Sequence, residues 1–278
     1  MGRYVSLRNR VQAVGLTDTG KVREHNEDSI ALDGDIGLFV LADGMGGYNA
    51  GEVASGMATS LIADGIQEEW KPADVQRLSR EEAKALSEKL IREQIGRANN
   101  AIFTTSQNNP ECAGMGTTLV VCLFYDNFMT VAHIGDSRLY RLRGDAMEQI
   151  TRDHSLLQEQ LDSGLITPEE AKLSQNKNLV TRALGIDPTV EPEIHVYETQ
   201  VGDSYLLCSD GLSDMVEDEE IRLTLITLRS NPNLTVQQLV QAANDNGGRD
   251  NISAVLIRVA EPFGVPRGWV ARLKALFR

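Results

Sequence analysis

Four aspartates stand where apolar, strand-like segments of the chain begin or end. Asp43, Asp136 and Asp210 each follow such a segment, and Asp250 comes just before another. In an antiparallel sheet the end of one strand lies beside the start of its neighbour, so these four side chains could converge on one edge. Carboxylates crowded beside an apolar core repel one another and are poorly hydrated, and they must either take up protons or bind cations. We therefore expect a cation site at this edge.

The expected cations are Mg²⁺ or Mn²⁺. The candidate ligands are all oxygen atoms, and the sequence has no His-x-His or Cys-x-x-Cys spacing of the kind that holds zinc. Gly44 and two nearby glycines fit the same site, because without a Cβ a backbone carbonyl can approach an ion closely. An Asp-Gly pair after a strand is by itself more typical of a turn. Two such pairs at corresponding strand ends, together with Asp136 and Asp250, favour the cation site over unrelated turns.

A charged segment, Arg23 to Asp28, precedes these aspartates. If the segment is extended, side-chain alternation places Arg23 and Glu27 on one face and Asp28 on the other. Arg23 and Glu27 could then serve one site, with the guanidinium of Arg23 binding an oxyanion through two parallel hydrogen bonds. Taken alone, the segment would be interpreted as a solvated charge cluster at the start of a strand.

The sequence excludes two other kinds of phosphate site, a P-loop and a cysteine-dependent phosphatase loop. Residues 15–21 fit the spacing of a phosphate-binding P-loop, but Val22 follows where that loop needs Ser or Thr for Mg²⁺. None of the three cysteines begins a Cys-x5-Arg loop, which excludes a phosphatase of the type that uses a thiolate nucleophile. An odd and sparse cysteine count also does not make a disulfide scaffold.

Short apolar segments rich in β-branched and aromatic residues are typical of strands. They cover residues 11–16, 36–42, 117–125, 128–134, 204–209 and 252–259. The residues Asp126-Asn127 between two of them predict a hairpin turn. The strands come in two groups with two helical patterns between them, so we expect an α+β layered sandwich rather than alternating βαβ units.

Helical periodicity is predicted over residues 51–70, 80–103 and about 235–245. The first helix is expected to bury Val53, Met57 and Leu61, with Ile62 and Ile66 beside them. The second is expected to bury Ala83, Leu86, Leu90, Ala98 and Ile102. Residues 155–178 are polar and weakly periodic apart from a capping-box pattern at 167–170, and we interpret them as a surface flap over a site.

The composition is 41% hydrophobic and 24% charged, which is ordinary for a soluble globular protein and excludes disorder across the whole chain. The longest strictly apolar run is about seven residues, far short of the roughly 20 that span a bilayer. The first residues lack the apolar core of a signal peptide, so the expected location is the cytoplasm. A net charge of −13 argues against binding to nucleic acid or to anionic membranes.

Together these features resemble the metal-dependent Ser/Thr protein phosphatases of the protein phosphatase 2C family, in its compact bacterial form. The matching segments follow the family's order over about residues 11–259; they are TDTGKVREHNEDS, VLADGMGGYNAGEVAS, GMGTTLVV, VAHIGDSRLYRLR, LVTRALG, LLCSDGLSDMV and GGRDNISAVLIRV. Any single Asp-Gly is a weak signal, but the series is specific. The resemblance implies a four-layer α-β-β-α sandwich, two antiparallel β-sheets flanked by helices, with a dinuclear metal site at one end.

The resemblance also implies a metal-ligand set. Asp43 would bridge two Mn²⁺ or Mg²⁺ ions. Asp210 and Asp250 would bind the first ion, and Glu27 with the carbonyl of Gly44 would bind the second. In this chemistry the two cations lower the pKa of a water molecule, which attacks phosphorus in line, and no covalent phosphoenzyme forms.

Further roles follow from the same resemblance. Asp28 would hold a water molecule of the metal site, and Arg23 would bind the phosphate. Bacterial members often hold a third ion, and Asp136 with Asp210 match that position. The family's variable flap falls on residues 155–178.

Two departures from the family's pattern concern proton transfer. Many eukaryotic members have a histidine directly after the Asp-Gly, where this chain has Met45, as many bacterial members do. Bacterial members also often have a histidine after the Gly-Gly, where this chain has Tyr48. A different proton donor or a metal-bound water must therefore serve the leaving group. We assign no catalytic role to His133, His154 or His195.

The tail, residues 262–278, lies outside the resemblance and contains four basic residues and no acidic one. If it is helical from Gly268, then Trp269, Leu273 and Leu276 line one face. We prefer the interpretation that this basic amphipathic segment docks on its own acidic domain. The alternative is an anchor to a partner or a membrane surface.

The predicted function is therefore hydrolysis of phosphoserine and phosphothreonine in proteins by residues 1–261, acting as a monomer and opposing a bacterial Ser/Thr kinase. A catalytically silent binding module of the same fold is disfavoured because every metal position is filled. A metal hydrolase of small phosphoesters remains the other alternative. Comparing a phosphopeptide with a small aryl phosphate would distinguish it.

Overall fold

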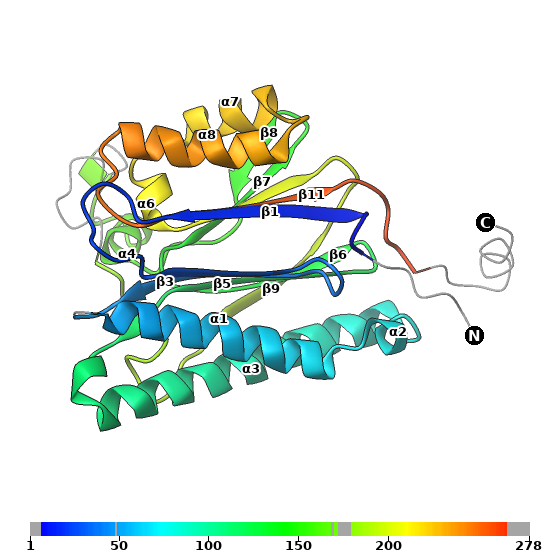
Figure 1. The fold of residues 1–278 in the computed structure, drawn as a ribbon. Helices are drawn as coiled ribbons and strands as arrows, with labels where there is room; N and C mark the ends of the chain where they lie inside the picture. The colour runs from blue at the N-terminus through cyan, green and yellow to red at the C-terminus, as the bar shows by residue number, and fades with distance from the viewer. Residues whose placement is uncertain (1–6, 48, 168–169, 172–178, 266–278) are drawn as a thin grey trace, which may run out of the picture.

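Two antiparallel sheets lie face to face in the computed structural model, and helices cover the outer face of each (Figure 1). The structure describes residues 7–47, 49–167, 170–171 and 179–265. The α+β class and the α-β-β-α order of layers predicted from the sequence are confirmed.

The first sheet contains five strands in the order β1 (Val11–Asp18), β11 (Ile252–Val259), β10 (Ser204–Cys208), β7 (Arg138–Arg143) and β8 (Ala146–Gln149). The second has the order β2 (Asp28–Asp33), β3 (Leu38–Met45), β5 (Leu119–Tyr125), β6 (Phe128–Ile134) and β9 (Glu193–Glu198), and the short β4 (Gly116–Thr117) pairs with β3. Because β11 lies between β1 and β10, strands from near the two ends of the described residues are neighbours in one sheet.

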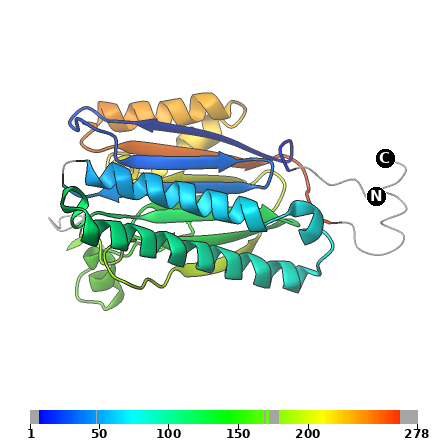
Figure 2. The same cartoon turned by 60° about the horizontal axis from the view of Figure 1, so that its bottom comes forward.

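Two long helices cover the second sheet: α1 (Ala50–Glu69) and α3 (Arg80–Asn108), with the short α2 (Pro72–Val75) between them in sequence. Figure 2 shows α1 and α3 side by side across that sheet. The first sheet is covered by α7 (Asp218–Thr227) and α8 (Pro232–Asp245). The shorter α4 (Leu156–Asp162) and α6 (Asp210–Ser213) lie at one end of the sandwich, on the left in Figure 1. A 3₁₀ turn (Pro110–Cys112) follows α3.

Because side chains alternate along each strand, three apolar cores separate the four layers of helices and sheets. Along β10, Tyr205 points toward the other sheet and Leu206 toward the helices. Between the sheets, Phe124 packs edge-on against Phe39 and Tyr205, with ring centroids 5.7 and 5.6 Å apart. Both faces of the central strands are buried, which is why their sequences are almost continuous apolar runs.

The predicted helices at 51–70 and 80–103 are confirmed as α1 and α3, but the buried face predicted for α1 is partly wrong. Val53 and Leu61 are 39% and 40% exposed. Ile62 and Ile66 are buried as predicted, and Ala54 and Ala58 complete the buried face in place of Val53 and Leu61. Small side chains let α1 lie close to its neighbours, so fit against β3 and α3 determines which face is buried.

The flap predicted at 155–178 begins with α4, and pairing of Ser155 with Val180 closes its base. The capping box at its centre is confirmed, since Thr167 and Glu170 exchange hydrogen bonds between side chain and backbone. Phe263, at the start of the predicted tail, is buried against the inter-sheet core. The tail helix predicted from residue 268 lies outside the described residues. Within the described ranges, no helix combines the length and hydrophobicity needed to cross a bilayer.

Candidate metal centre

Strand ends from both sheets bring the predicted acidic residues to one end of the sandwich. Asp28 begins β2 and lies directly opposite Asp43 of β3. Asp210 opens α6, immediately beyond β10, and Asp250 precedes β11, which pairs with β10. Asp136 follows β6 after a single glycine-containing turn. The convergence expected from antiparallel strands is therefore present.

The carboxylates raise one another's pKa. Burial raises the pKa of Asp43 well above its ordinary value, and the charges of Asp28, Asp210, Asp136 and Asp250 add to the shift. Burial followed by the charge of Asp136 acts in the same way on the pKa of Asp210. Burial also raises the pKa of Asp28 and of Asp136 to about 6. Burial and mutual repulsion together disfavour the ionised carboxylates, and bound cations would stabilise them.

The two carboxylate oxygens of Asp28 differ in their hydrogen bonding. Oδ2 accepts a hydrogen bond from the hydroxyl of Ser209, at 2.9 Å, across the gap between the sheets. Ser209 is itself held by the backbone N–H of Ser253, at 2.9 Å. The other oxygen, Oδ1, is buried and has no hydrogen-bond partner among the described residues. An orphaned buried carboxylate oxygen fits a site that is completed by an ion or by an ordered water.

Glu27 and Gly44 lie together beside the first turn of α1. The N–H of Gly44 donates to the carbonyl of Glu27 at 3.0 Å, and the N–H of Gly51 donates to Oε1 of Glu27 at 3.2 Å. A Cβ on Gly44 would lie 2.1 Å from the carbonyl oxygen of Gly51, so no other residue fits there. This close approach is the reason for glycine after Asp43.

Arg23 reaches the same centre, although its segment is not the extended strand that the sequence suggested. Residues 19–27 form turns and irregular backbone, because the N–H groups of Lys21 and Val22 donate to the carbonyl of Gly248, at 2.7 and 3.2 Å. The guanidinium of Arg23 is half exposed and contacts Asp250 at 2.7 Å. The basic group therefore lies at the open rim of the carboxylate cluster.

Sequence reasoning missed the residue that holds this irregular segment. The side-chain amide of Asn251 donates to the carbonyls of Thr19 and His25, both at 2.9 Å, and its Oδ1 accepts from the N–H of Glu27 at 2.8 Å. Asn251 is 4% exposed. The sequence signal that could have identified Asn251 is its place as a polar residue between Asp250 and the apolar run of β11.

In the second sheet, the side chain of Thr118 holds two site segments together by hydrogen bonds. Its Oγ1 accepts from the N–H of Asp43 at 3.1 Å and shares a hydrogen bond with the hydroxyl of Ser137 at 2.7 Å. The turn that carries Asp136 is thereby connected to the strand that carries Asp43. Both hydroxyl residues sit at the ends of apolar segments, where a turn would ordinarily explain them.

An open cleft of about 750 Å³ adjoins the carboxylates. It runs from Asp210 and Asp250 between α4 of the flap and the loop after α6. Leu157 and Leu161 line one side, and Asp214 lies on the other. The size and position suit an extended segment of another chain rather than a small enclosed ligand.

Comparison with known proteins identifies the family. Residues 20–256 match the family model described as protein phosphatase 2C. The serine/threonine phosphatase stp of Listeria innocua is 38% identical over 244 residues, which are 87% of this chain and 93% of that protein. This chain therefore belongs to the protein phosphatase 2C family, and the prediction of a protein phosphatase of this family is confirmed.

Solved structures agree with the fold. Serine/threonine phosphatase Stp1 from Staphylococcus aureus has a TM-score of 0.81 and 35% identity, with 93% of this chain and 99% of that chain covered. The catalytic domain of the serine/threonine protein phosphatase PstP, in complex with two manganese ions, has a TM-score of 0.77 and 37% identity, with 90% and 99% covered.

Proposed function

We propose that this chain hydrolyses phosphoserine and phosphothreonine in proteins with two Mn²⁺ or Mg²⁺ ions. The observation that carries the proposal is the cluster of mutually repelling carboxylates at one end of the sandwich, next to a buried Asp28 oxygen that has no partner among the described residues. Such a cluster fits divalent ions with oxygen ligands. The manganese-bound structure of PstP, at 37% identity, supports the same cofactor.

Six residues would hold the ions: Glu27, Asp43, Gly44, Asp136, Asp210 and Asp250. Asp43 would be the central ligand of this set, since the charges of four neighbouring aspartates act on it. Asp210 and Asp250 would bind one of the two, and Glu27 with the carbonyl of Gly44 the other. Asp136 and Asp210 would hold a third ion, and each raises the pKa of Asp43.

When bound, the ions would lower the pKa of a water molecule and neutralise the charge of the phosphate. Asp28 would orient the attacking water through Oδ1 while Ser209 holds Oδ2. Arg23, at the rim, would bind the non-bridging phosphate oxygens. The water oxygen bonds to phosphorus as the bond to the serine or threonine oxygen breaks, and that oxygen takes a proton to give the free hydroxyl.

We also propose that residues 1–261 act as one catalytic unit, as a monomer, in the cytoplasm. The family model spans most of this range. The three cysteines are free thiols, which is typical of a reducing compartment. The substrates would be phosphoproteins supplied by a Ser/Thr kinase.

Phosphate release from a phosphothreonine peptide with Mn²⁺, with and without chelator, tests the proposal. Asp210→Asn should remove the activity and weaken Mn²⁺ binding measured by calorimetry, because it neutralises a proposed ligand of one core ion and of the third ion. Asp64→Asn makes the same change on the exposed face of α1 and should leave both unchanged. Release that is indifferent to chelator, or that survives in Asp210→Asn, would refute the metal centre.

A parallel assay with a small aryl phosphate tests the substrate class. The open cleft predicts a higher kcat/KM for the phosphopeptide. A much higher value for the small ester would instead make the chain a general phosphoesterase.

A further inference from the structure

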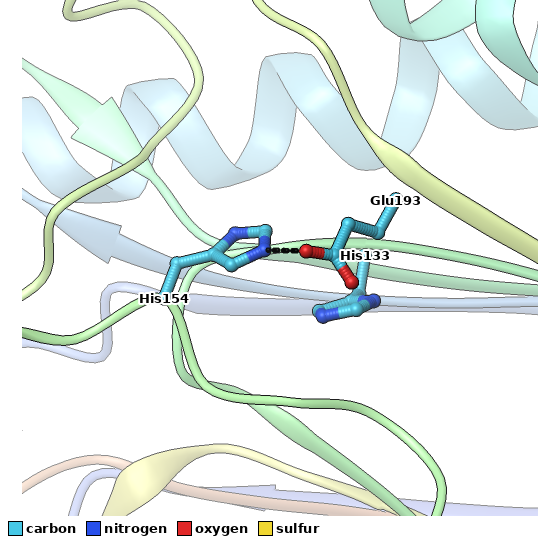
Figure 3. A group of neighbouring side chains, drawn as sticks. All are labelled: His133, His154 and Glu193. Carbon is cyan, nitrogen blue, oxygen red and sulfur yellow. Dashed lines mark hydrogen bonds and ion pairs between the residues drawn. The ribbon is translucent and has the colours of Figure 1, made fainter. Parts of the chain in front are cut away.

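A second group of titratable side chains lies outside the proposed metal ligands: His133, His154 and Glu193 (Figure 3). His133 is on β6 and pairs in register with Glu193 at the start of β9. His154 lies between β8 and α4. The two imidazoles are buried and stack with centroids 4.9 Å apart and planes 22° apart.

Hydrogen bonds fix the proton positions on both rings. The backbone N–H of Gly135 donates to Nδ1 of His154 at 3.2 Å, so this nitrogen carries no proton. Nε2 of His154 therefore carries the proton and donates to Oε1 of Glu193 at 3.1 Å. Nε2 of His133 faces the carbonyl of Arg152 at 2.8 Å and must donate to it.

These tautomers argue against a cation site. Both nitrogens of His154 are already used, so an ion could bind only if the hydrogen bond to Glu193 or to Gly135 were broken. Burial lowers the pKa of both imidazoles, which agrees with neutral rings. The cluster is better described as a hydrogen-bonded unit that keeps one imidazole in one orientation.

The imidazole is aimed at the turn that carries Asp136. His154 makes two hydrogen bonds to Gly135, one through Nδ1 and one in which its own backbone N–H donates to the Gly135 carbonyl at 2.9 Å. Gly135 has a φ of +96°, and a Cβ there would lie 2.7 Å from Thr118. The turn is thus enclosed between Thr118, which also holds Asp43, and His154.

The same residue joins the two ends of the flap. The N–H of Thr181 donates to the carbonyl of His154 at 2.8 Å, and the N–H of Leu156 donates to the carbonyl of Leu179 at 2.9 Å. Ser155 and Val180 pair between them. His154 is therefore where the base of the flap meets the turn before Asp136.

We propose that His154 is a positioning residue: its Nδ1 fixes the Gly135–Asp136 turn and thereby sets the Asp136 carboxylate relative to the base of the flap. Glu193 serves it by fixing the tautomer in which Nδ1 accepts. The consequence for catalysis rests on the proposed function, in which Asp136 is a metal ligand.

A matched pair of variants separates this role from general packing. In His154→Asn, Oδ1 can occupy the place of Nδ1 and still accept from Gly135. In His154→Gln, the amide nitrogen can occupy the place of Nε2 and donate to Glu193, but nothing accepts from Gly135. The measurement is the hydrogen-exchange rate of the Gly135 amide by NMR in the full Mg²⁺-loaded protein, with Mn²⁺ affinity by calorimetry.

The Gly135 amide should exchange roughly five- to tenfold faster in His154→Gln than in His154→Asn, the change expected from one lost hydrogen bond. Mn²⁺ should also bind more weakly to His154→Gln. Equal exchange rates and equal Mn²⁺ affinities in the two variants would overturn the proposal. The proposal would also be overturned if the wild type bound an additional Zn²⁺ that both His154 variants fail to bind, because the cluster of His133, His154 and Glu193 would then be a cation site.

Glu193 supplies a second test should His154→Gln fail to fold. Glu193→Gln keeps an acceptor for Nε2 and should leave the Gly135 amide protected, whereas Glu193→Ala removes the acceptor and should reduce the protection. Identical protection in these two variants would contradict the tautomer argument. Absence of phosphatase activity in the wild type would refute the proposed function alone, because amide exchange does not depend on catalysis.

Discussion

Replacing Gly44 by alanine should weaken both the fold and ion binding. The new Cβ would lie 2.1 Å from the carbonyl oxygen of Gly51 and 2.6 Å from that of Glu27, whereas ordinary contacts begin at 3.4 Å. The first turn of α1 or the segment before β2 must therefore move by about 1 Å or more. Either movement disturbs the position of the Glu27 carboxylate.

The expected cost follows from these contacts. Overpacking of this kind destabilises by about 1–3 kcal/mol. The hydrogen bonds from Gly44 to the Glu27 carbonyl and from Gly51 to its carboxylate are strained at the same time, and each contributes about 1 kcal/mol. In a domain of this size the melting temperature should fall by roughly 5–10 °C. Mn²⁺ affinity should fall as well, because Glu27 and the Gly44 carbonyl are proposed ligands.

Gly47→Ala is the control, since Gly47 is exposed and no described atom lies within 4 Å of the position that its new Cβ would take. Thermal unfolding in chelator measures the packing cost alone, and calorimetry with Mn²⁺ measures the effect on the site. If Gly44→Ala and Gly47→Ala have the same melting temperature and the same Mn²⁺ affinity, the argument from the close approach at Gly44 is refuted.

Three further predictions concern the same centre. Asn251→Asp keeps the acceptor for the Glu27 N–H but loses the donor to the carbonyls of Thr19 and His25. Arg23 should then lose its fixed position, and KM for a phosphopeptide should rise several-fold. An unchanged KM would contradict this. Burial raises the pKa of Asp28 and Asp136 to about 6, so the folded, ion-free protein binds more protons than the unfolded chain, and its free energy of unfolding in urea should increase as the pH falls from 8 to about 5. Saturating Mn²⁺ should abolish that trend, and a stability that falls over this range in chelator would show that the sign is wrong. Arg23→Ala should lower kcat/KM by roughly 10- to 100-fold, with Arg23→Lys in between because a single ammonium cannot form two parallel hydrogen bonds.

The chemistry of the site could be predicted because acidic residues stand in unusual places. An aspartate at the end of a buried apolar segment is costly unless something uses it. Asp43 lies near the end of β3, and Asp136 and Asp210 come just beyond β6 and β10. Antiparallel pairing then brings them together without any knowledge of side-chain contacts. The central strands were also predictable, since burial on both faces leaves almost continuous apolar sequence.

Features decided by tertiary contacts could not be predicted in this way. Of the edge strands, β8 is mostly exposed and β9 mixes polar residues with partly buried apolar ones. Neither is a continuous apolar run, so their pairing follows from the neighbouring strands and not from their own pattern. The irregular course of residues 19–27 depends on Gly248 and Asn251, more than 200 residues away. The face of α1 depends on how closely a helix can approach β3, which hydrophobic spacing does not encode.

The position of β11 has a consequence for the newly synthesised chain. This last strand lies between β1 and β10, so the first sheet cannot be completed until residues 252–259 have been made. Asp250 arrives with it, whereas Glu27 and Asp28 are made near the beginning. A ribosome-bound fragment that lacks β11 therefore has neither a complete sheet nor a complete set of carboxylates. Because Asp250 is a proposed metal ligand, we expect phosphatase activity only after β11 has been made, and no shorter product should remove phosphate from proteins before then.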